Sequence, residues 1–85
     1  MTLLSYEIFQ TIIEQGSFAK AAQLLHLTPS AVSHSISSME EEVGFPLFIR
    51  NKNGVQLTSA GEQICPYLQK IVAANNSLLQ TVSQM

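Results

Sequence analysis

The chain has 85 residues, of which 46% are hydrophobic, and a formal net charge of −2 at neutral pH. A chain of this length forms one small domain that is marginal alone, which favours a partner surface. The apolar fraction is that of a globular protein, and no apolar run approaches the ~18 residues that span a bilayer. The single cysteine, Cys65, excludes an internal disulfide, and the N-terminus lacks the pattern of a secretory signal. These features predict a cytoplasmic domain.

The first half of the chain has the periodicity of three helices. Apolar residues predict a helix over residues 3–15, ended by Gly16, with the stripe Leu4, Ile8, Phe9, Ile12 and Ile13. A second helix is expected over about 18–25, with Ser17 as its N-cap, and a third over about 29–43, with Thr28 as its N-cap. Pro29 suits the first helical position and Gly44 the stop. Two short helices joined by a tight turn form a helix-turn-helix, whose second helix enters the DNA major groove.

The second half of the chain predicts a hairpin and one long helix. Two β-prone runs, 47–50 and 55–57, flank a turn in which Asn53 and Gly54 can supply positive φ values. The helix is expected over about 59–82, opened by a capping box of Ser59 and Glu62 and bent at Pro66. The expected fold is mainly α. It is a winged helix-turn-helix over residues 1–58, with a three-helix core plus a two-stranded wing, followed by a linker or dimerisation helix over 59–85.

Ordered blocks of sequence carry a family resemblance. The blocks are Phe9 with Gly16-Ser17-Phe18 and Ala21-Ala22, then Ile36-Ser37-Ser38-Met39-Glu40 with Val43-Gly44-Phe45-Pro46-Leu47-Phe48-Ile49-Arg50, and Val55-Gln56-Leu57-Thr58-Ser59-Ala60-Gly61. Over about residues 4–80 the chain closely resembles the N-terminal DNA-binding domain of LysR-type transcriptional regulators.

This resemblance implies sequence-specific binding of double-stranded DNA by a bacterial, cytoplasmic and nucleoid-associated regulator. Helix 29–43 would lie in the major groove and the wing in the minor groove. The chain looks like a truncation, because the family's regulators continue into an effector-binding domain. No cofactor is expected in this chain, since a small-molecule effector would bind that absent C-terminal domain.

The outward face of the third predicted helix is rich in hydroxyl groups. At 100° per residue, Ser30, His34, Ser37 and Glu41 lie opposite the buried stripe, and five serines and one histidine fall within residues 30–38. Solvated helix faces usually carry Lys, Glu and Gln. The residues themselves therefore favour contact with DNA, with an ordinary solvated face as the alternative.

The resemblance assigns contacts to individual positions of this helix. Thr28 and Ser30 would touch phosphate or base edges, and Ser33 would bind a phosphate. The family often has glutamine where Pro29 stands and usually has arginine where His34 stands. Pro29 can therefore give only apolar contact, and an imidazole is charged only on the acid side of neutrality. Ser37 also replaces a frequent basic residue, so this helix has lost charge.

The wing supplies the remaining expected contacts. Arg50 matches the family arginine that grips the DNA backbone, with a surface salt bridge to a glutamate as its alternative. Lys52 and Asn53 at the wing tip are expected to contact the minor groove or phosphate, with a solvated turn as a near-equal alternative. The predicted DNA-contacting set is Thr28, Pro29, Ser30, Ser33, His34, Ser37, Arg50, Lys52 and Asn53.

An apolar stripe on the last predicted helix points to a protein interface. Its members are spaced four, three, four, three and four apart, as in a coiled coil: Ile64, Leu68, Ile71, Asn75, Leu78 and Val82. In the family this segment pairs two subunits, so we expect a homodimer, with a tetramer left open for the full-length protein. The alternative is that the stripe folds back onto its own domain.

Composition leaves two function classes to compare. There is no aspartate, the two histidines are eight residues apart and a lone cysteine cannot make a zinc site, so neither an enzyme nor a metal site is predicted. The net charge of −2 lacks the basic surplus of most nucleic-acid modules. The alternative to a DNA-binding domain is therefore a winged-helix protein–protein interaction module with weak or no DNA binding.

Overall fold

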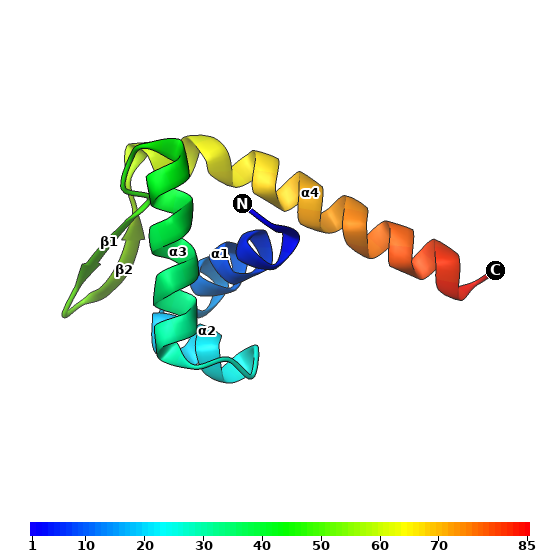
Figure 1. Cartoon of the computed structure of the whole chain (residues 1–85), viewed down its shortest axis with the longest axis horizontal. Helices are drawn as coiled ribbons and strands as arrows, with labels where there is room; N and C mark the ends of the chain where they lie inside the picture. Colours follow the sequence, from blue (N-terminus) through cyan, green and yellow to red (C-terminus); the bar gives the residue numbers. More distant parts are fainter.

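The computed structural model describes residues 1–85 as four helices and a two-stranded antiparallel sheet (Figure 1). The elements are α1 (Leu3–Gln15), α2 (Phe18–Leu24), α3 (Pro29–Val43), β1 (Phe48–Asn51), β2 (Gly54–Leu57) and α4 (Ser59–Ser83). The first three helices pack together, the hairpin projects from one side, and α4 runs away from the hairpin toward the C-terminus. The predicted winged helix-turn-helix with a long terminal helix is confirmed.

The ends of the first three helices follow from local chemistry. The Ser17 hydroxyl accepts a hydrogen bond from the Lys20 backbone N–H, and the Thr28 hydroxyl accepts one from that of Ala31, both at 3.1 Å. Gly16 and Gly44 end α1 and α3 in the left-handed conformation, with φ of 69° and 84°. These two N-caps and two glycine stops are confirmed as predicted.

The start of α4 differs from the prediction. The N-cap is Thr58, whose hydroxyl oxygen accepts from the Gly61 N–H at 3.1 Å and donates to the Pro46 carbonyl at 2.6 Å. The predicted capping box of Ser59 and Glu62 is therefore wrong, because the contact with Pro46 fixes the cap one residue earlier. The helix continues through Pro66 and remains helical on both sides of it.

The hairpin pairs Phe48 with Leu57 and Arg50 with Val55, and its turn consists of Lys52 and Asn53. Within the hairpin only Gly54 has a positive φ, of 121°, so the expectation that Asn53 shares this conformation is wrong. The Asn51 side chain instead stabilises the turn, because its amide oxygen accepts from the Asn53 N–H at 2.8 Å.

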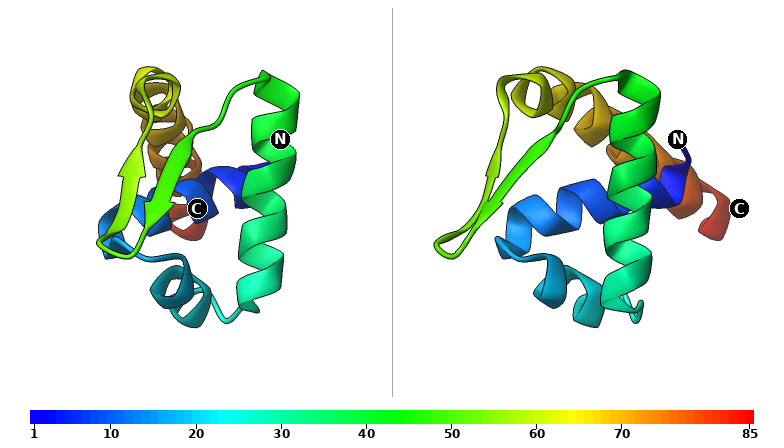
Figure 2. Two further views of the ribbon diagram at one scale, coloured as in Figure 1. Left: turned by 90° about the vertical axis from the view of Figure 1, so that its left-hand side faces the viewer. Right: turned by 60° about the vertical axis from the view of Figure 1, so that its left-hand side comes forward.

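The core lies where α1, α2, α3 and the base of the wing meet (Figure 2). Its most buried large side chains are Ile8, Phe9, Ile12, Val32, Met39 and Leu47. Leu4, predicted on the buried stripe, is 52% exposed. The stripe that α1 buries runs through Ser5, Ile8, Phe9 and Ile12, so Leu4 falls outside it.

The two halves of α4 have different surroundings. Gly61, Leu68 and Val72 are buried against the rest of the domain, and Leu68 belongs to the main core cluster. Ile64 packs partly against the same cluster. The placement of Leu68 at a subunit interface is therefore wrong, since its side chain is already covered by its own chain. Beyond Val72 every residue except the half-buried Asn75 is exposed.

Gly61 provides a test of this packing. A Cβ atom at Gly61 would overlap the Leu47 carbonyl oxygen and lie 2.9 Å from Leu57 Cδ2. We expect Gly61→Ala to lower the free energy of unfolding by about 1–3 kcal/mol in urea titrations, because the backbone must move apart. Helix propensity alone predicts the opposite sign, a gain of about 1 kcal/mol. A stabilised variant would contradict the close approach of α4 to Leu47.

Candidate nucleic-acid interface

The helix α3 and the hairpin lie on the side of the molecule away from the C-terminal half of α4 (Figures 1 and 2). Thr28, Pro29, Ser30, His34 and Ser37 are exposed on α3, and Ser33 is half-buried. On the wing, the side chains of Arg50, Lys52 and Asn53 are exposed. All nine predicted contact residues are thus on α3, its N-cap or the wing, and their side chains are at least partly accessible.

Arg50 joins the wing to the helix-turn-helix. Its Cζ atom lies 3.9 Å from the centroid of the Phe18 ring, and its Nη1 lies 3.5 Å from the Ser33 hydroxyl oxygen. The only ion pair in the structure joins the N-terminal amine of Met1 to Glu42. The alternative reading of Arg50, a salt bridge to a glutamate, is therefore not found.

The predicted residues of α3 divide between two flanks. Ser33 faces the wing through Arg50. His34 borders a shallow hollow shared with Met1, Thr2, Ser38 and Glu42, on the flank toward the start of α1. The structure thus brings Ser33 and Arg50 together, whereas His34, about 100° further around the helix, borders the hollow near Met1.

Glu40 has a structural role that sequence reasoning missed. Its Oε2 accepts from the backbone N–H of Leu47 at 2.6 Å and is 3.4 Å from that of Phe48. The carboxylate therefore anchors the start of β1 to the last turn of α3. No local pattern signals this contact, because it depends on how the loop after Gly44 closes.

Charge is unevenly distributed over the fold. Lys20 lies on α2 and Arg50 and Lys52 on the wing, so three of the four basic residues belong to the elements beside α3. Within the acidic run 40–42, Glu40 binds the β1 backbone and Glu42 binds the N-terminal amine. Glu7 and Glu14 border a hollow beside α4 together with Val72 and Asn76. The side of the molecule that carries α3 and the wing thus has Arg50 and Lys52 together with the exposed Glu41, so the net negative charge of the whole chain does not describe it.

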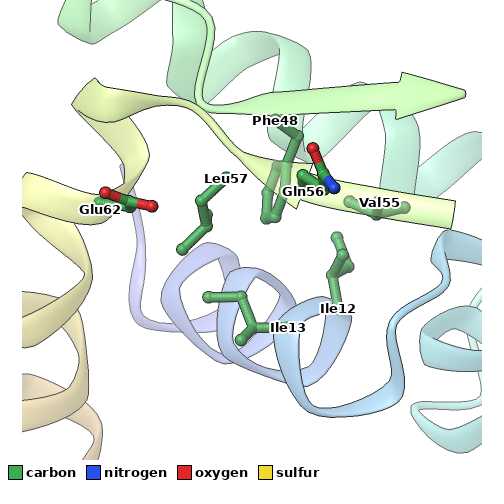
Figure 3. A pocket seen from close by; sticks show the side chains of 7 residues that line it. All are labelled: Ile12, Ile13, Phe48, Val55, Gln56, Leu57 and Glu62. Carbon is green, nitrogen blue, oxygen red and sulfur yellow. The ribbon is translucent and has the colours of Figure 1, made fainter.

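A mainly apolar groove lies between α1 and the wing. A groove of about 380 Å³ between α1 and the wing is lined by Ile12, Ile13, Phe48, Val55, Gln56, Leu57 and Glu62 (Figure 3). Its lining is mainly apolar, with a single carboxylate. No group of three or more His, Cys, Asp or Glu side chains is placed to hold a metal ion.

No helix has the length and apolar character of a membrane span.

Cys65 packs beside the core and is half-buried. Desolvation by its neighbours raises the pKa of the thiol above its ordinary value, which disfavours the thiolate. The residue thus has the character of a small packed side chain.

Residues 3–62 match the family described as "Bacterial regulatory helix-turn-helix protein, lysR family". This match covers more than half of the chain. The chain belongs to the LysR family. The family consists of transcriptional regulators, and this LysR-family domain is not an enzyme.

Relatives with known sequences and structures agree with this assignment. The domain is 42% identical over 73 residues to the uncharacterised regulator YvbU of Bacillus subtilis, covering 85% of this chain and 25% of that protein. It is 33% identical over 84 residues to the regulator IlvY of Escherichia coli, covering 99% of this chain and 28% of IlvY. The LysR-family domain thus spans about a quarter of the length of these relatives.

Solved structures reproduce the fold closely. The BenM DBD in complex with catB site 1 DNA superposes with a TM-score of 0.90 at 27% identity, covering 99% of this chain and 94% of that one. A CbnR DBD–DNA complex gives a TM-score of 0.85 at 25% identity, covering 99% and 98%. Corynebacterium glutamicum OxyR gives 0.91 at 29% identity, covering 96% of this chain and 26% of OxyR.

Glu40 generates a prediction for the LysR-family domain. We expect Glu40→Ala to lower the free energy of unfolding by about 1–3 kcal/mol, because the part-buried Leu47 N–H loses its acceptor. Glu41→Ala is the matched control, since Glu41 is the exposed neighbour on the same helix with no hydrogen-bond partner. Thermal or urea unfolding followed by circular dichroism measures both. Equal effects of the two variants would contradict the anchoring role of Glu40.

Proposed function

We propose that this LysR-family domain binds double-stranded DNA sequence-specifically, with α3 in the major groove and the wing at the adjacent minor groove. The observation that carries the proposal is the juxtaposition of Arg50 on the wing with Ser33 on α3, 3.5 Å apart, with Arg50 in no ion pair. The BenM and CbnR domains that share the fold were solved with DNA. A regulator of this kind works on the chromosome, in the cytoplasm and nucleoid.

Each contact residue has a chemical role in this proposal. Thr28 and Ser30 lie at the N-terminus of α3, where backbone N–H groups and the helix dipole favour phosphate. Ser33 and Arg50 donate to one stretch of DNA backbone, while Lys52 and Asn53 at the wing tip reach the minor groove or its phosphates. Pro29 gives apolar contact with base edges. His34 and Ser37 contact the flanks of the groove.

The small number of charges sets the strength of binding. Counterion release scales with the number of phosphates neutralised, and the interface holds only Arg50, Lys52 and the nearby Lys20 as permanent cations. Isolated domains therefore bind weakly and need a second copy to gain affinity. Two linked half-site contacts raise affinity by about 10²–10⁴-fold through effective concentration.

The second copy is proposed to pair through α4. Tyr67, Ile71, Leu78 and Val82 are 67%, 42%, 59% and 55% exposed. At about 100° per residue, Ile71, Leu78 and Val82 lie within about 40° of one another, adjacent to the face that carries Leu68. Asn75, half-buried, interrupts this stripe.

The proposed interface therefore leaves out Leu68 and adds Tyr67. It keeps the other members of the predicted stripe, which are Ile64, Ile71, Asn75, Leu78 and Val82. Association of such pairs into a tetramer, and binding of a small-molecule effector, belong to the proposed full-length regulator. No cofactor is proposed for the chain itself.

The experiment that tests DNA binding compares wild type with Arg50→Ala. We expect both to bind a labelled duplex in anisotropy titrations, with log affinity falling linearly with log salt concentration. Removing Arg50 should weaken binding to all duplexes about equally and lower the slope by about one unit, because one phosphate contact is lost. Gln56→Ala, an exposed wing position outside the proposed contacts, is the control. A wild-type domain without salt-dependent binding would favour the protein-interaction module instead.

The assembly is tested by Leu78→Glu. We expect this variant to remain folded and to weaken dimerisation at least about tenfold, because a carboxylate replaces an apolar contact at the seam. Gln80→Glu adds the same charge on the opposite side of α4 and serves as control. Leu68→Glu is expected to unfold the domain rather than separate the subunits.

Sedimentation equilibrium and circular dichroism on the same samples measure both properties. A wild-type chain that remains monomeric at about 100 μM, well above the range of specific association, would contradict the proposed interface.

A further inference from the structure

We propose that Phe18, a core side chain, is a positioning residue for DNA binding, whose ring holds the Arg50 guanidinium in place to meet a phosphate. The inference rests on the proposed contact of Arg50 with the DNA backbone. It assigns to the first residue of α2 a role beyond packing.

The geometry places Phe18 between the core and the DNA-facing cation. The ring is 6% exposed and meets Phe48 edge to face, with centroids 5.5 Å apart and an interplanar angle of 76°. Arg50 Cζ lies 3.9 Å from the centroid of the same ring. A cation this close to an aromatic face is attracted by the ring quadrupole. Phe18 is therefore fixed by the core on one side and holds the guanidinium on another.

The alternation of β1 brings Arg50 to this ring. Side chains two residues apart in a strand lie on the same face. Phe48 is buried and Ile49 is 48% exposed, so Arg50 lies on the face of β1 that Phe48 anchors to the core. Burial of Phe48 thus also directs Arg50 toward Phe18.

Stacking leaves the guanidinium free to bind. A salt bridge would occupy its N–H groups, which are its only means of contacting phosphate. The guanidinium carbon instead lies 3.9 Å from the centroid of the ring, and the arginine side chain stays exposed, with Nη1 near the Ser33 hydroxyl. The arginine is then ordered before DNA arrives and loses less side-chain freedom on binding.

The test measures binding of a labelled random-sequence duplex by Phe18→Leu, Arg50→Ala and the double variant. We expect Phe18→Leu to raise the Kd about 3-fold to 10-fold, the range of a partly exposed cation–π contact. Its salt slope should equal that of wild type, because Arg50 still neutralises a phosphate. In the Arg50→Ala background, Phe18→Leu should cause no further loss. Additional weakening in that background would overturn the proposal, since Phe18 would then act independently of Arg50.

Phe9→Leu is the matched control. Phe9 is fully buried and its ring lies 4.9 Å from that of Phe48, yet Arg50 stacks on Phe18 and not on Phe9. Loss of this aromatic ring should change stability and raise the Kd of the folded domain by less than Phe18→Leu does, because the guanidinium keeps the ring it lies over. An equal loss of affinity in Phe9→Leu and Phe18→Leu would mean that altered core packing causes the loss, and it would overturn the proposal.

Proton NMR of the free wild-type domain tests the stack without any variant. The Arg50 side-chain methylene protons should be shifted upfield by the ring current of Phe18, and unshifted resonances would overturn the proposal even if Phe18→Leu failed to fold. A different result distinguishes failure of the proposed DNA binding from failure of this inference. A wild-type domain that binds no duplex at low salt overturns DNA binding and this inference together, whereas normal binding by Phe18→Leu overturns this inference alone.

Discussion

The arrangement of the domain depends on the packing of the Phe48 side chain in the core. A hairpin of two four-residue strands is not stable in isolation, so its position must be fixed by packing. Phe48 lies 4.9 Å from Phe9 and 5.5 Å from Phe18, measured between ring centroids, and so attaches the wing to α1 and α2. Glu40 completes the attachment by binding the backbone at the start of β1. Through these contacts the wing acquires a fixed place beside α3.

The sequence predicted those features that local chemistry determines. Helix bounds near Ser17, Thr28 and Gly44 follow from hydrogen bonds and backbone conformations within a few residues. Thr58 shows where such reasoning ends. Its selection as the N-cap over Ser59 depends on the Pro46 carbonyl, twelve residues away along the chain.

The sequence predicted which residues lie on the exposed face of the candidate site, but not which side chains contact one another there. The exposed hydroxyl face of α3 follows from helical periodicity and the resemblance. The stacking of Arg50 on Phe18 required the packing of β1 against α2, which no periodicity encodes. Leu68 illustrates the same limit on α4, since two adjacent apolar faces exist and only tertiary packing decides which of them turns inward.

The helix α4 links the proposed binding face to the proposed assembly. Its first half is part of the core through Gly61, Leu68 and Val72, while its second half extends free of the domain (Figure 1). Rotation of α4 about its axis is constrained at Gly61, where the helix backbone approaches Leu47 and Leu57 closely. The spacing and orientation of two recognition helices would then be set by a rigid element and not by a flexible linker.

Residue-by-residue mapping of the DNA interface tests whether α3 and the wing bind DNA. In NMR titrations of the isotopically labelled domain with a duplex at low salt, we expect amide shifts at Thr28, Ser30 and Ser33 and at the wing tip, Lys52 and Asn53. The second half of α4, beyond Val72, should keep its shifts. Perturbations confined to α4 or to the groove between α1 and β2, with α3 unaffected, would contradict DNA binding through α3 and the wing.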